Sequence, residues 1–390
     1  MRRAVAAAAL LAALLAATPA AARDKWDTRV FAKVPLPGFP ALSLVKPDGR
    51  IYVGTYENPS GDTLPSRVLE FGPDGTLGRS WVMTGQDLSK PHGIQVAARY
   101  PDGRLLLLDH SPPRALILDP RSGSDLRPFA TFADLAPCGT PPCSKTVTDN
   151  PPQPDYAAWG PDRSLYVTDY QQGTIWKVAP SGGAAKVWLT DPALDGGMFG
   201  TSGIVLGPDQ KTLFISQGSS QGLVDGNPST GRLYKVAIQA DGSPGPLQQI
   251  WESGPAEAPD GFALAQSGNV YMALVGPGTN QLVEISPTGQ ELGRFPADRS
   301  GANGTAVPFD EPSSVVFDGT RLIVTNLAYA SGNTDHQVLF DVEAGEPGLP
   351  VFVPPGAAPP PVKAKPRPKH KKKPKHHKKK KKRRKKRARH

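Results

Sequence analysis

One recurring phrase constrains the fold of this chain more than any other feature. It reads PDGRIYVGTY from residue 47, PDGRLLLLDH from 101, PDRSLYVTDY from 161 and PDQKTLFISQ from 208, with looser copies QSGNVYMALV from 266 and FDGTRLIVTN from 317. A turn rich in Asp and Gly followed by a short aliphatic or β-branched run predicts a hairpin that enters a buried strand. Repetition of such a unit indicates a repeat architecture.

The segments on either side of each turn repeat as well. The strand before the turn recurs as FPALSLVK, PHGIQVAA, PDYAAWG, TSGIVLG, PDGFALA and PSSVVF, and a third strand usually follows, as in RVLEFGPDG and TIWKVAPSGG. Six copies predict six sheets of roughly four strands each. No long stretch shows helical periodicity, which favours a predominantly β fold. Packing six such sheets radially buries both faces of each sheet, so we expect an all-β, six-bladed β-propeller.

Composition divides the chain into four parts. Residues 1–22, with Arg2 and Arg3 before an apolar run that ends near Ala22, are typical of a secretory signal peptide. We expect the propeller over residues 25–352, with KWDTRVFAKV pairing into the last blade. Residues 353–368 form a Pro-rich linker, and the Lys/Arg/His-rich tail over 363–390 has no apolar residues except two alanines and three prolines with which to fold. This organisation predicts a secreted or extracytoplasmic protein.

The formal charge of +10 hides two opposite parts. The tail holds 19 of the 45 basic residues and no acid, so the rest of the chain has 26 basic against 35 acidic residues, a net charge of −9. Outside a membrane, such a tail favours anionic cell-envelope polymers or phospholipid headgroups, bound by counterion release. Nucleic acid is a less favoured partner, since the tail has no aromatic residue for base stacking.

The two cysteines lie close together in the sequence APCGTPPCSK. Cys138 and Cys143 have the spacing of a small disulfide-closed loop, as is common in exported proteins. A zinc site would need further Cys or His ligands nearby, and none is present in this stretch.

The innermost strands of a propeller converge on a central channel, so equivalent residues of the six copies should form a ring. The residue at the start of each inner strand is, in chain order, Ala41, His92, Asp155, Ser202, Asp260 and Ser313. Oxygen donors gathered in this way suit a hard divalent cation such as calcium. We assign Asp155, Asp260 and Ser202 as candidate metal ligands, and Ser313 and Asn326 as candidate substrate-binding residues.

The motifs PDGFALA, TSGIVLG and the repeated PDG-strand phrase resemble the family of senescence marker protein, gluconolactonase and luciferin-regenerating enzyme. That resemblance implies a six-bladed propeller with a divalent metal in the channel and hydrolysis of sugar lactones or related esters. The family's metal ligands, Glu, Asn and Asp, match Ala41, Ser202 and Asp260, so only the Asp is retained. Its substrate-contacting Asn matches Asp155.

The stretch PHGIQVAARYPDGRLLLLDHSPP is similar to a second propeller family, the calcium-dependent paraoxonases. That resemblance implies a pair of histidines, His92 and His110, near the metal. Its calcium ligands match Ala41, Asp155, Ser202, Asp260 and Gly261, of which Ala41 and Gly261 offer no side-chain ligand.

These features predict hydrolysis of a lactone or ester. His92 would take a proton from the attacking water, His110 would orient His92 or relay its proton, and a cation would polarise the carbonyl group. Structural explanations compete with each role, because a His in a PHG turn can simply bond to backbone and a polar residue at a strand end can cap a turn. A non-catalytic, ligand-binding propeller tethered by its tail is the alternative function.

Overall fold

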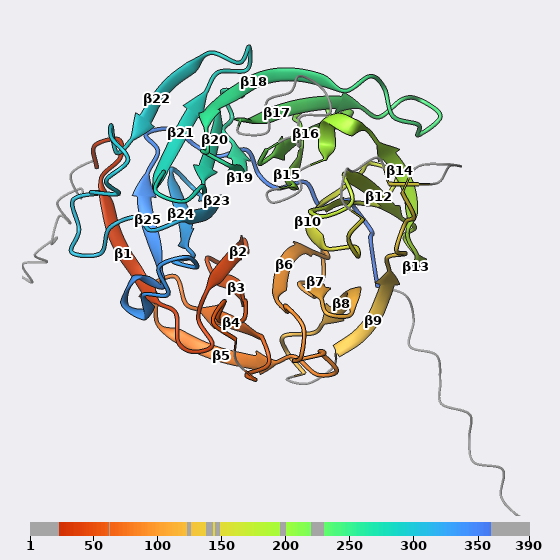
Figure 1. Ribbon diagram of the computed structural model, residues 1–390, viewed down its shortest axis with the longest axis horizontal. Helices are drawn as coiled ribbons and strands as arrows, with labels where there is room; N and C mark the ends of the chain where they lie inside the picture. Colours follow the sequence, from red (N-terminus) through yellow and green to blue (C-terminus); the bar gives the residue numbers. More distant parts are fainter. Residues whose placement is uncertain are drawn as a thin grey trace, which may run out of the picture. The chain divides into compact units, whose positions relative to one another are not determined.

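The computed structural model describes residues 23–359, except for residues 62, 123–125, 138–142, 145–148, 196–199 and 220–229. Within this part of the chain the secondary structure is almost entirely β, and the sheets stand in a ring around a central axis (Figure 1). The predicted signal peptide, the tail and Cys138 lie outside the described residues. None of the described helices is long and apolar enough to cross a membrane.

Six sheets form the six blades that the repeat predicts. Blade one contains β2 (Pro40–Val45), β3 (Ile51–Thr55), β4 (Arg67–Phe71) and β5 (Leu77–Val82). Blade two contains β6 (Ile94–Arg99), β7 (Leu105–His110), β8 (Pro113–Leu118) and β9 (Leu126–Thr131), extended by the short β13 (Gly183–Ala184). Blade three contains β10 (Pro154–Trp159), β11 (Leu165–Asp169), β12 (Thr174–Val178) and β14 (Lys186–Thr190).

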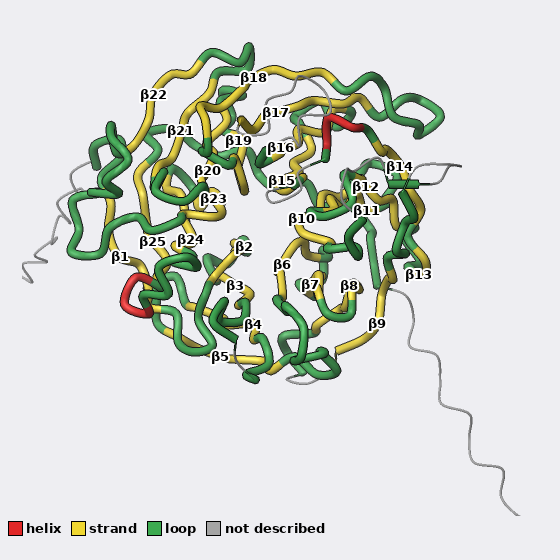
Figure 2. The backbone as a smooth tube through the Cα atoms, in the orientation of Figure 1, coloured by secondary structure: helices red, strands yellow, loops and turns green. Residues whose placement is uncertain are grey.

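The remaining blades follow the same antiparallel order from the axis outward (Figure 2). Blade four contains β15 (Thr201–Leu206), β16 (Thr212–Gln217), β17 (Thr230–Ala237) and β18 (Gln248–Pro255). Blade five contains β19 (Pro259–Leu264), β20 (Val270–Leu274), β21 (Gln281–Ile285) and β22 (Glu291–Phe295). Blade six contains β23 (Pro312–Asp318), β24 (Arg321–Asn326), β25 (Val338–Glu343) and β1 (Thr28–Lys33). Two 3₁₀ turns, Pro192–Leu194 and Thr334–His336, lie in loops.

The Asp of the recurring phrase organises each hairpin turn. The Asp102 carboxylate accepts the backbone N–H of Arg104 at 3.1 Å, and Asp162 and Asp209 make the same bond two residues on. Gly103 adopts the left-handed conformation that the turn requires, with φ of 86°. These aspartates are therefore turn residues, as their position in the repeat predicts.

The hydrophobic core lies between neighbouring blades. Tyr100 of blade two packs edge-to-face on Trp159 of blade three, and Trp176 is fully buried in the same cluster. Burying one large apolar side chain contributes about 1.5–3 kcal/mol. Similar clusters in the other seams hold the inner strands in fixed positions around the axis.

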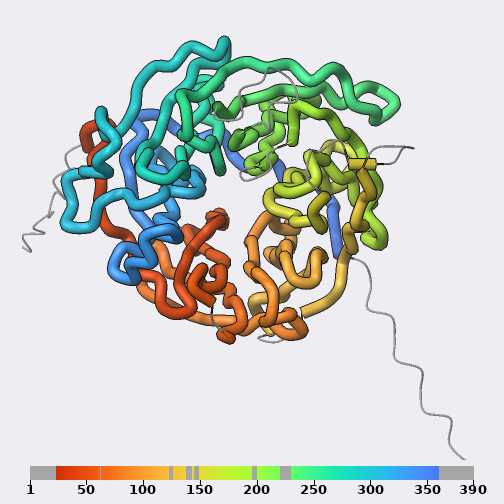
Figure 3. The backbone as a smooth tube through the Cα atoms, in the orientation of Figure 1, coloured from red at the N-terminus to blue at the C-terminus, as the bar shows by residue number. Residues whose placement is uncertain are grey.

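The N-terminal strand closes the ring as predicted. β1 pairs antiparallel with β25, so the first and last described strands share one blade. The red N-terminal strand therefore lies beside the blue C-terminal one in Figure 3. Just before β1, Arg23 forms an ion pair with Asp341 at 2.5 Å and Trp26 stacks on Phe295 at 5.4 Å.

Candidate functional site

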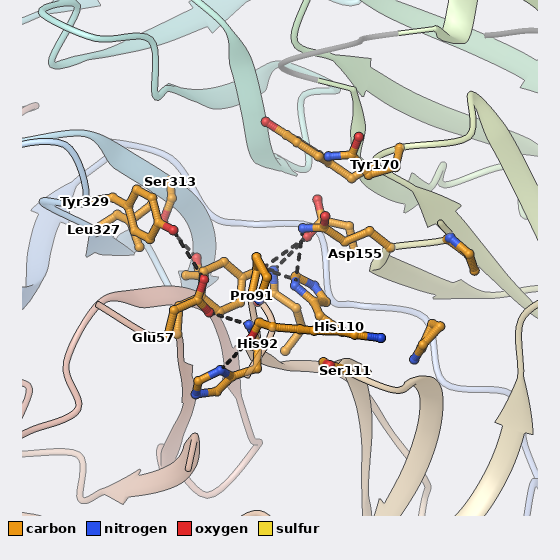
Figure 4. A pocket seen from close by; sticks show the side chains of 18 of the residues that line it. Glu57, Pro91, His92, His110, Ser111, Asp155, Tyr170, Ser313, Leu327 and Tyr329 are labelled. Carbon is orange, nitrogen blue, oxygen red and sulfur yellow. Dashed lines mark hydrogen bonds between the residues drawn. The ribbon is translucent and has the colours of Figure 1, made fainter. Parts of the chain in front are cut away.

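A cavity of about 800 Å³ opens at the centre of the ring, on the side where the inner strands begin. Two sets of equivalent positions build its wall. The starts of inner strands contribute Ala41, Asp155, Asp260 and Ser313, with His92 just before β6. The ends of the second strands contribute Tyr56, His110, Tyr170, Val275 and Leu327. Figure 4 shows several of these side chains around the opening.

Asp155, which is buried, and Asp260, which is half-buried, form a pair of carboxyl groups in this cavity. Burial raises the pKa of Asp155 to about 7. Burial and the nearby Asp155 charge raise the pKa of Asp260 well above its usual range. Two like charges close together in a poorly solvated site cannot both ionise easily. One carboxyl of such a pair can therefore accept a proton while the other donates one.

Tyr56 stands at the centre of the polar network around Asp155. Its hydroxyl accepts the Gln95 Nε2–H at 2.6 Å and lies 3.5 Å from Asp155 Oδ1, to which it can donate. Gln95 Nε2 also donates to Asp155 Oδ1 at 2.7 Å. The Tyr56 ring packs directly on Gly93, where any side chain would collide with it. This contact fixes the ring, and the network holds Asp155 in one orientation.

His110 joins the same network from the end of β7. Its Nε2 lies 3.3 Å from the Tyr56 hydroxyl, and its Nδ1 accepts from the Gln153 side-chain amide at 3.2 Å. Burial lowers the pKa of the His110 imidazole to about 3. The ring is therefore neutral at physiological pH, and it can position Tyr56 rather than supply a positive charge.

The His92 side chain does not lie where the sequence predicted it. The His92 ring is buried, with Nδ1 3.0 Å from the Lys90 carbonyl oxygen and Nε2 2.9 Å from the Leu64 carbonyl oxygen. Its backbone N–H donates to Glu57 Oε2 at 2.5 Å. Our expectation that the imidazole would face Asp155 and Asp260 is therefore not met, because both ring nitrogens bond to backbone.

Tyr156 forms the floor of the cavity. It begins in blade three and crosses the ring centre, where its hydroxyl donates to the Ser313 carbonyl oxygen of blade six at 3.1 Å. The same hydroxyl contacts Asp260 and lies against Gly261, where a Cβ would collide with it. The glycine thus gives the tyrosine room to span the channel.

The other predicted residues have different places. Ser202 hydrogen bonds to the Asp260 side chain, whereas its role as a metal ligand stays a prediction. The Ser313 hydroxyl reaches the cavity wall but bonds to the Ala41 carbonyl oxygen at 2.9 Å. Asn326 is fully buried outside the cavity wall, where its side-chain amide bonds to the backbone of its own blade. The structure thus gives Asn326 no place near a ligand in the cavity.

Two glutamates and a tyrosine that the sequence did not single out line the opposite wall. The Tyr329 hydroxyl donates to Glu57 Oε1 at 3.4 Å, and the charge of Glu311 also acts on it. Glu311 Oε2 accepts the backbone N–H of Ala330 at 2.6 Å. Burial raises the pKa of both carboxyls. Glu57 and Tyr329 follow second strands and Glu311 precedes the inner strand β23, at positions where the other copies have different residues, so the repeat did not mark them.

The donor set for a divalent cation is incomplete. Asp155 and Asp260 supply carboxylates and Ser202 a hydroxyl, whereas Ala41 and Gly261 supply no side-chain ligand. Calcium takes six to eight oxygens. Among the described residues no three His, Cys, Asp or Glu side chains gather in a way that could hold a metal ion. These side chains do not by themselves fit the predicted calcium site.

The predicted disulfide stays a prediction. Cys143 is buried, whereas Cys138 lies outside the described residues.

Solved structures with the same ring of blades include several enzymes. Regucalcin from Agrobacterium tumefaciens, described as a calcium-binding protein, matches with a TM-score of 0.55 at 18% identity, covering 84% of this chain and 96% of that one. The likeness establishes the six-bladed propeller fold. A gluconolactonase from Xanthomonas campestris matches with a TM-score of 0.51 at 16% identity, covering 82% and 88% of the two chains.

A neighbour with different chemistry shows how little function this fold implies. The PQQ-bound aldose sugar dehydrogenase from Streptomyces coelicolor matches with a TM-score of 0.52 at 15% identity, covering 81% of this chain and 97% of that one. No protein-family model matches the sequence, and no curated protein matches it significantly. Function therefore has to be argued from the site.

Proposed function

We propose that this protein hydrolyses a lactone or ester of a small molecule, with Asp155 and Asp260 as the acid–base pair. One observation carries the proposal: two carboxyl groups, one buried and one half-buried, lie together in a cavity large enough for a small molecule, and Gln95 and Tyr56 orient one of them. The predicted lactone chemistry is retained, whereas the proton acceptor moves from His92 to Asp155.

The reaction uses groups that the cavity already holds. Asp155 accepts a proton from water as the water oxygen bonds to the carbonyl carbon. Protonated Asp260 donates a hydrogen bond to the carbonyl oxygen, where negative charge develops. When the tetrahedral intermediate collapses, the C–O bond to the alcohol breaks and the departing oxygen takes the proton from Asp155. The products are a carboxylic acid and an alcohol, joined in one molecule if the substrate is a lactone.

Substitution of the two aspartates tests this assignment. Asp155→Asn keeps the shape of the side chain but removes the proton acceptor, and Asp260→Leu removes the hydrogen-bond donor to the carbonyl oxygen, so we expect each change to lower hydrolysis by about 10²–10⁴-fold. Asp102→Asn, in an exposed hairpin turn, is the matched control and should retain full activity. Rates on a panel of γ- and δ-lactones and aryl esters measure the effect.

The same panel separates the enzyme from the alternative. A wild-type protein that binds lactones without opening any of them would support a ligand-binding propeller instead. Full activity in Asp155→Asn would remove Asp155 from the mechanism even if the protein proved to be a hydrolase.

The predicted divalent cation needs its own measurement, because the side-chain donor set is incomplete. Elemental analysis of the purified protein shows whether calcium or another metal is bound. Hydrolysis that persists after chelation supports proton transfer by the two carboxyls. Activity lost on chelation and restored by calcium would show that a metal completes the site.

We also propose export and binding of the tail to an anionic cell-envelope surface, from the sequence of residues 1–22 and 363–390. Deletion of residues 363–390 should release the protein from envelope fractions at low salt, as should high salt acting on the full chain. Unchanged partitioning after the deletion would contradict the proposed tether.

A further inference from the structure

We infer that the cavity binds an organic cation, so that the substrate of the proposed hydrolysis carries a protonated amine. That the bound cation is also the substrate rests on the proposed function. Binding of the cation rests only on the cavity and can be measured without any reaction.

The acidic groups of the cavity outnumber the basic groups near them, of which His92 acts on Glu57. Besides the exposed Asp87, four acidic residues line the cavity: Glu57, Asp155, Asp260 and Glu311. Within the described part of the chain, no lysine or arginine forms an ion pair with any of them. The one lysine in the wall, Lys90, is largely exposed and lies 3.7 Å from Asp87. A cavity with this excess of carboxyls is complementary to a positively charged ligand.

A buried hydrogen-bond acceptor points to a donor that the protein does not supply. Gln95 lies in the cavity wall and is 1% exposed, and its Nε2 donates to both Tyr56 and Asp155. Its Oε1 has no hydrogen-bond partner. A buried amide oxygen without a donor costs free energy, so such atoms usually have a partner. An N–H or O–H group of a ligand, or the water that Asp155 activates, would supply the missing donor on the Asp155 side of the cavity.

Tyrosine rings supply the second element of cation recognition. Tyr56, Tyr170 and Tyr329 come from blades one, three and six and all line the cavity. Figure 4 shows Tyr170 and Tyr329 on opposite sides of the opening. The face of an aromatic ring attracts a cation within about 6 Å, by roughly 0.5–2 kcal/mol. Lone carboxylates would favour a small hydrated ion, whereas carboxylates among tyrosines favour an organic one.

The arrangement separates the two ends of such a molecule. Glu57 and Tyr329 lie on one side of the opening in Figure 4, and Asp155 and Tyr170 lie on the other. Glu311, close to Tyr329, adds a second carboxyl to the first side. An ammonium group held between Glu57 and Glu311 would leave the carbonyl end of the molecule at Asp155.

Calorimetric titration of the full mature chain with benzylamine and benzyl alcohol tests the inference, because these probes have nearly the same shape and differ in charge. The buffer contains EDTA, so that no divalent metal competes for the site. We expect benzylamine to bind at least tenfold more tightly than benzyl alcohol. Equal affinity for the two probes would overturn the inference.

Three variants locate the binding. Glu57→Gln and Glu311→Gln keep acceptors for the backbone N–H groups of His92 and Ala330, so the fold should persist, and each should reduce the preference for the amine by at least threefold. Glu291→Gln, on the outer strand β22, is the control and should leave the preference unchanged. Circular dichroism confirms folding of each variant. A preference that survives in both cavity variants would place the cation elsewhere and contradict the inference.

Hydrolysis is measured separately with a pair of phenyl esters, one bearing an amine and the other a methyl group in its place. Faster hydrolysis of the amino ester supports both proposals. Binding of benzylamine without hydrolysis of either ester would refute the proposed function and leave the cation site standing. Faster hydrolysis of the neutral ester would confirm a hydrolase but overturn the cationic substrate.

Discussion

The Tyr156 hydroxyl donates a 3.1 Å hydrogen bond to the Ser313 carbonyl oxygen, joining opposite blades across the centre of the ring. Gly261 makes room for this side chain. Gly261→Ala should therefore lower the free energy of unfolding by about 1–3 kcal/mol, because the new methyl group meets both Tyr156 and Ser314. Urea denaturation measures the loss.

Gly293→Ala is the matched control for that change, since nothing lies near its added methyl group and its backbone conformation is ordinary. It should leave stability almost unchanged. Equal losses in the two variants would mean that the tyrosine contact is not the cause.

Tyr56→Phe tests the network that orients Asp155. The change removes one hydroxyl that bonds to Gln95 and faces Asp155 and His110, while the ring keeps its contact with Gly93. We expect kcat to fall by about 10–100-fold with little change in melting temperature. Tyr329→Phe, on the opposite wall, should alter KM more than kcat, and the reverse pattern would argue against these roles.

The two histidines should respond differently to substitution. His92→Gln breaks bonds to the Lys90 and Leu64 carbonyl oxygens, so it should cost about 1–3 kcal/mol of stability while the folded fraction stays active. His110→Gln should mainly lower the rate, since His110 contacts Tyr56. Activity and thermal melting of both variants decide the matter, and complete loss of activity in well-folded His92→Gln would restore His92 as a catalytic candidate.

The low pKa of His110 predicts a pH-dependent contribution to stability. Burial lowers this pKa to about 3 in the folded protein, whereas an unfolded histidine has a pKa of about 6.5. Between these values the unfolded chain binds a proton that the folded protein does not. The free energy of unfolding therefore falls as the pH drops from about 6.5 towards 3. The raised pKa of Asp155 acts in the opposite direction.

Comparison of wild type with His110→Gln isolates the histidine from the carboxyls. As pH falls from 7 to 4, the wild type should lose more of its melting temperature than the variant does. Parallel curves would show that His110 does not titrate as the buried site implies.

The repeat predicted the blades and the closing strand. It also predicted that Asp155, Asp260 and His110 lie at the central channel, because equivalent positions of a propeller meet at the axis. Tyr56 and Tyr170 end the same phrase as His110, so the alignment that located the histidine contained them too. Their role was missed because tyrosine in a buried strand looks like core.

Other features of the site depend on contacts that no spacing encodes. The direction of the His92 ring is set by carbonyl groups of Leu64 and Lys90. Glu57 and Glu311 adjoin repeated strands, but the other copies of the repeat have no acidic residue at these positions. Burial, rather than residue type, then decides the protonation of these groups.

The pairing of β1 with β25 has a consequence for the order in which the molecule can form. During synthesis the first strand leaves the ribosome more than 300 residues before its partner. Blade six therefore cannot be completed until the whole ring has been translated, and a nascent chain that ends before Val338 leaves β1 without a partner and β24 with one open edge. The wall of the cavity includes residues of blade six. The cavity is therefore completed only late in the folding of the newly synthesised chain.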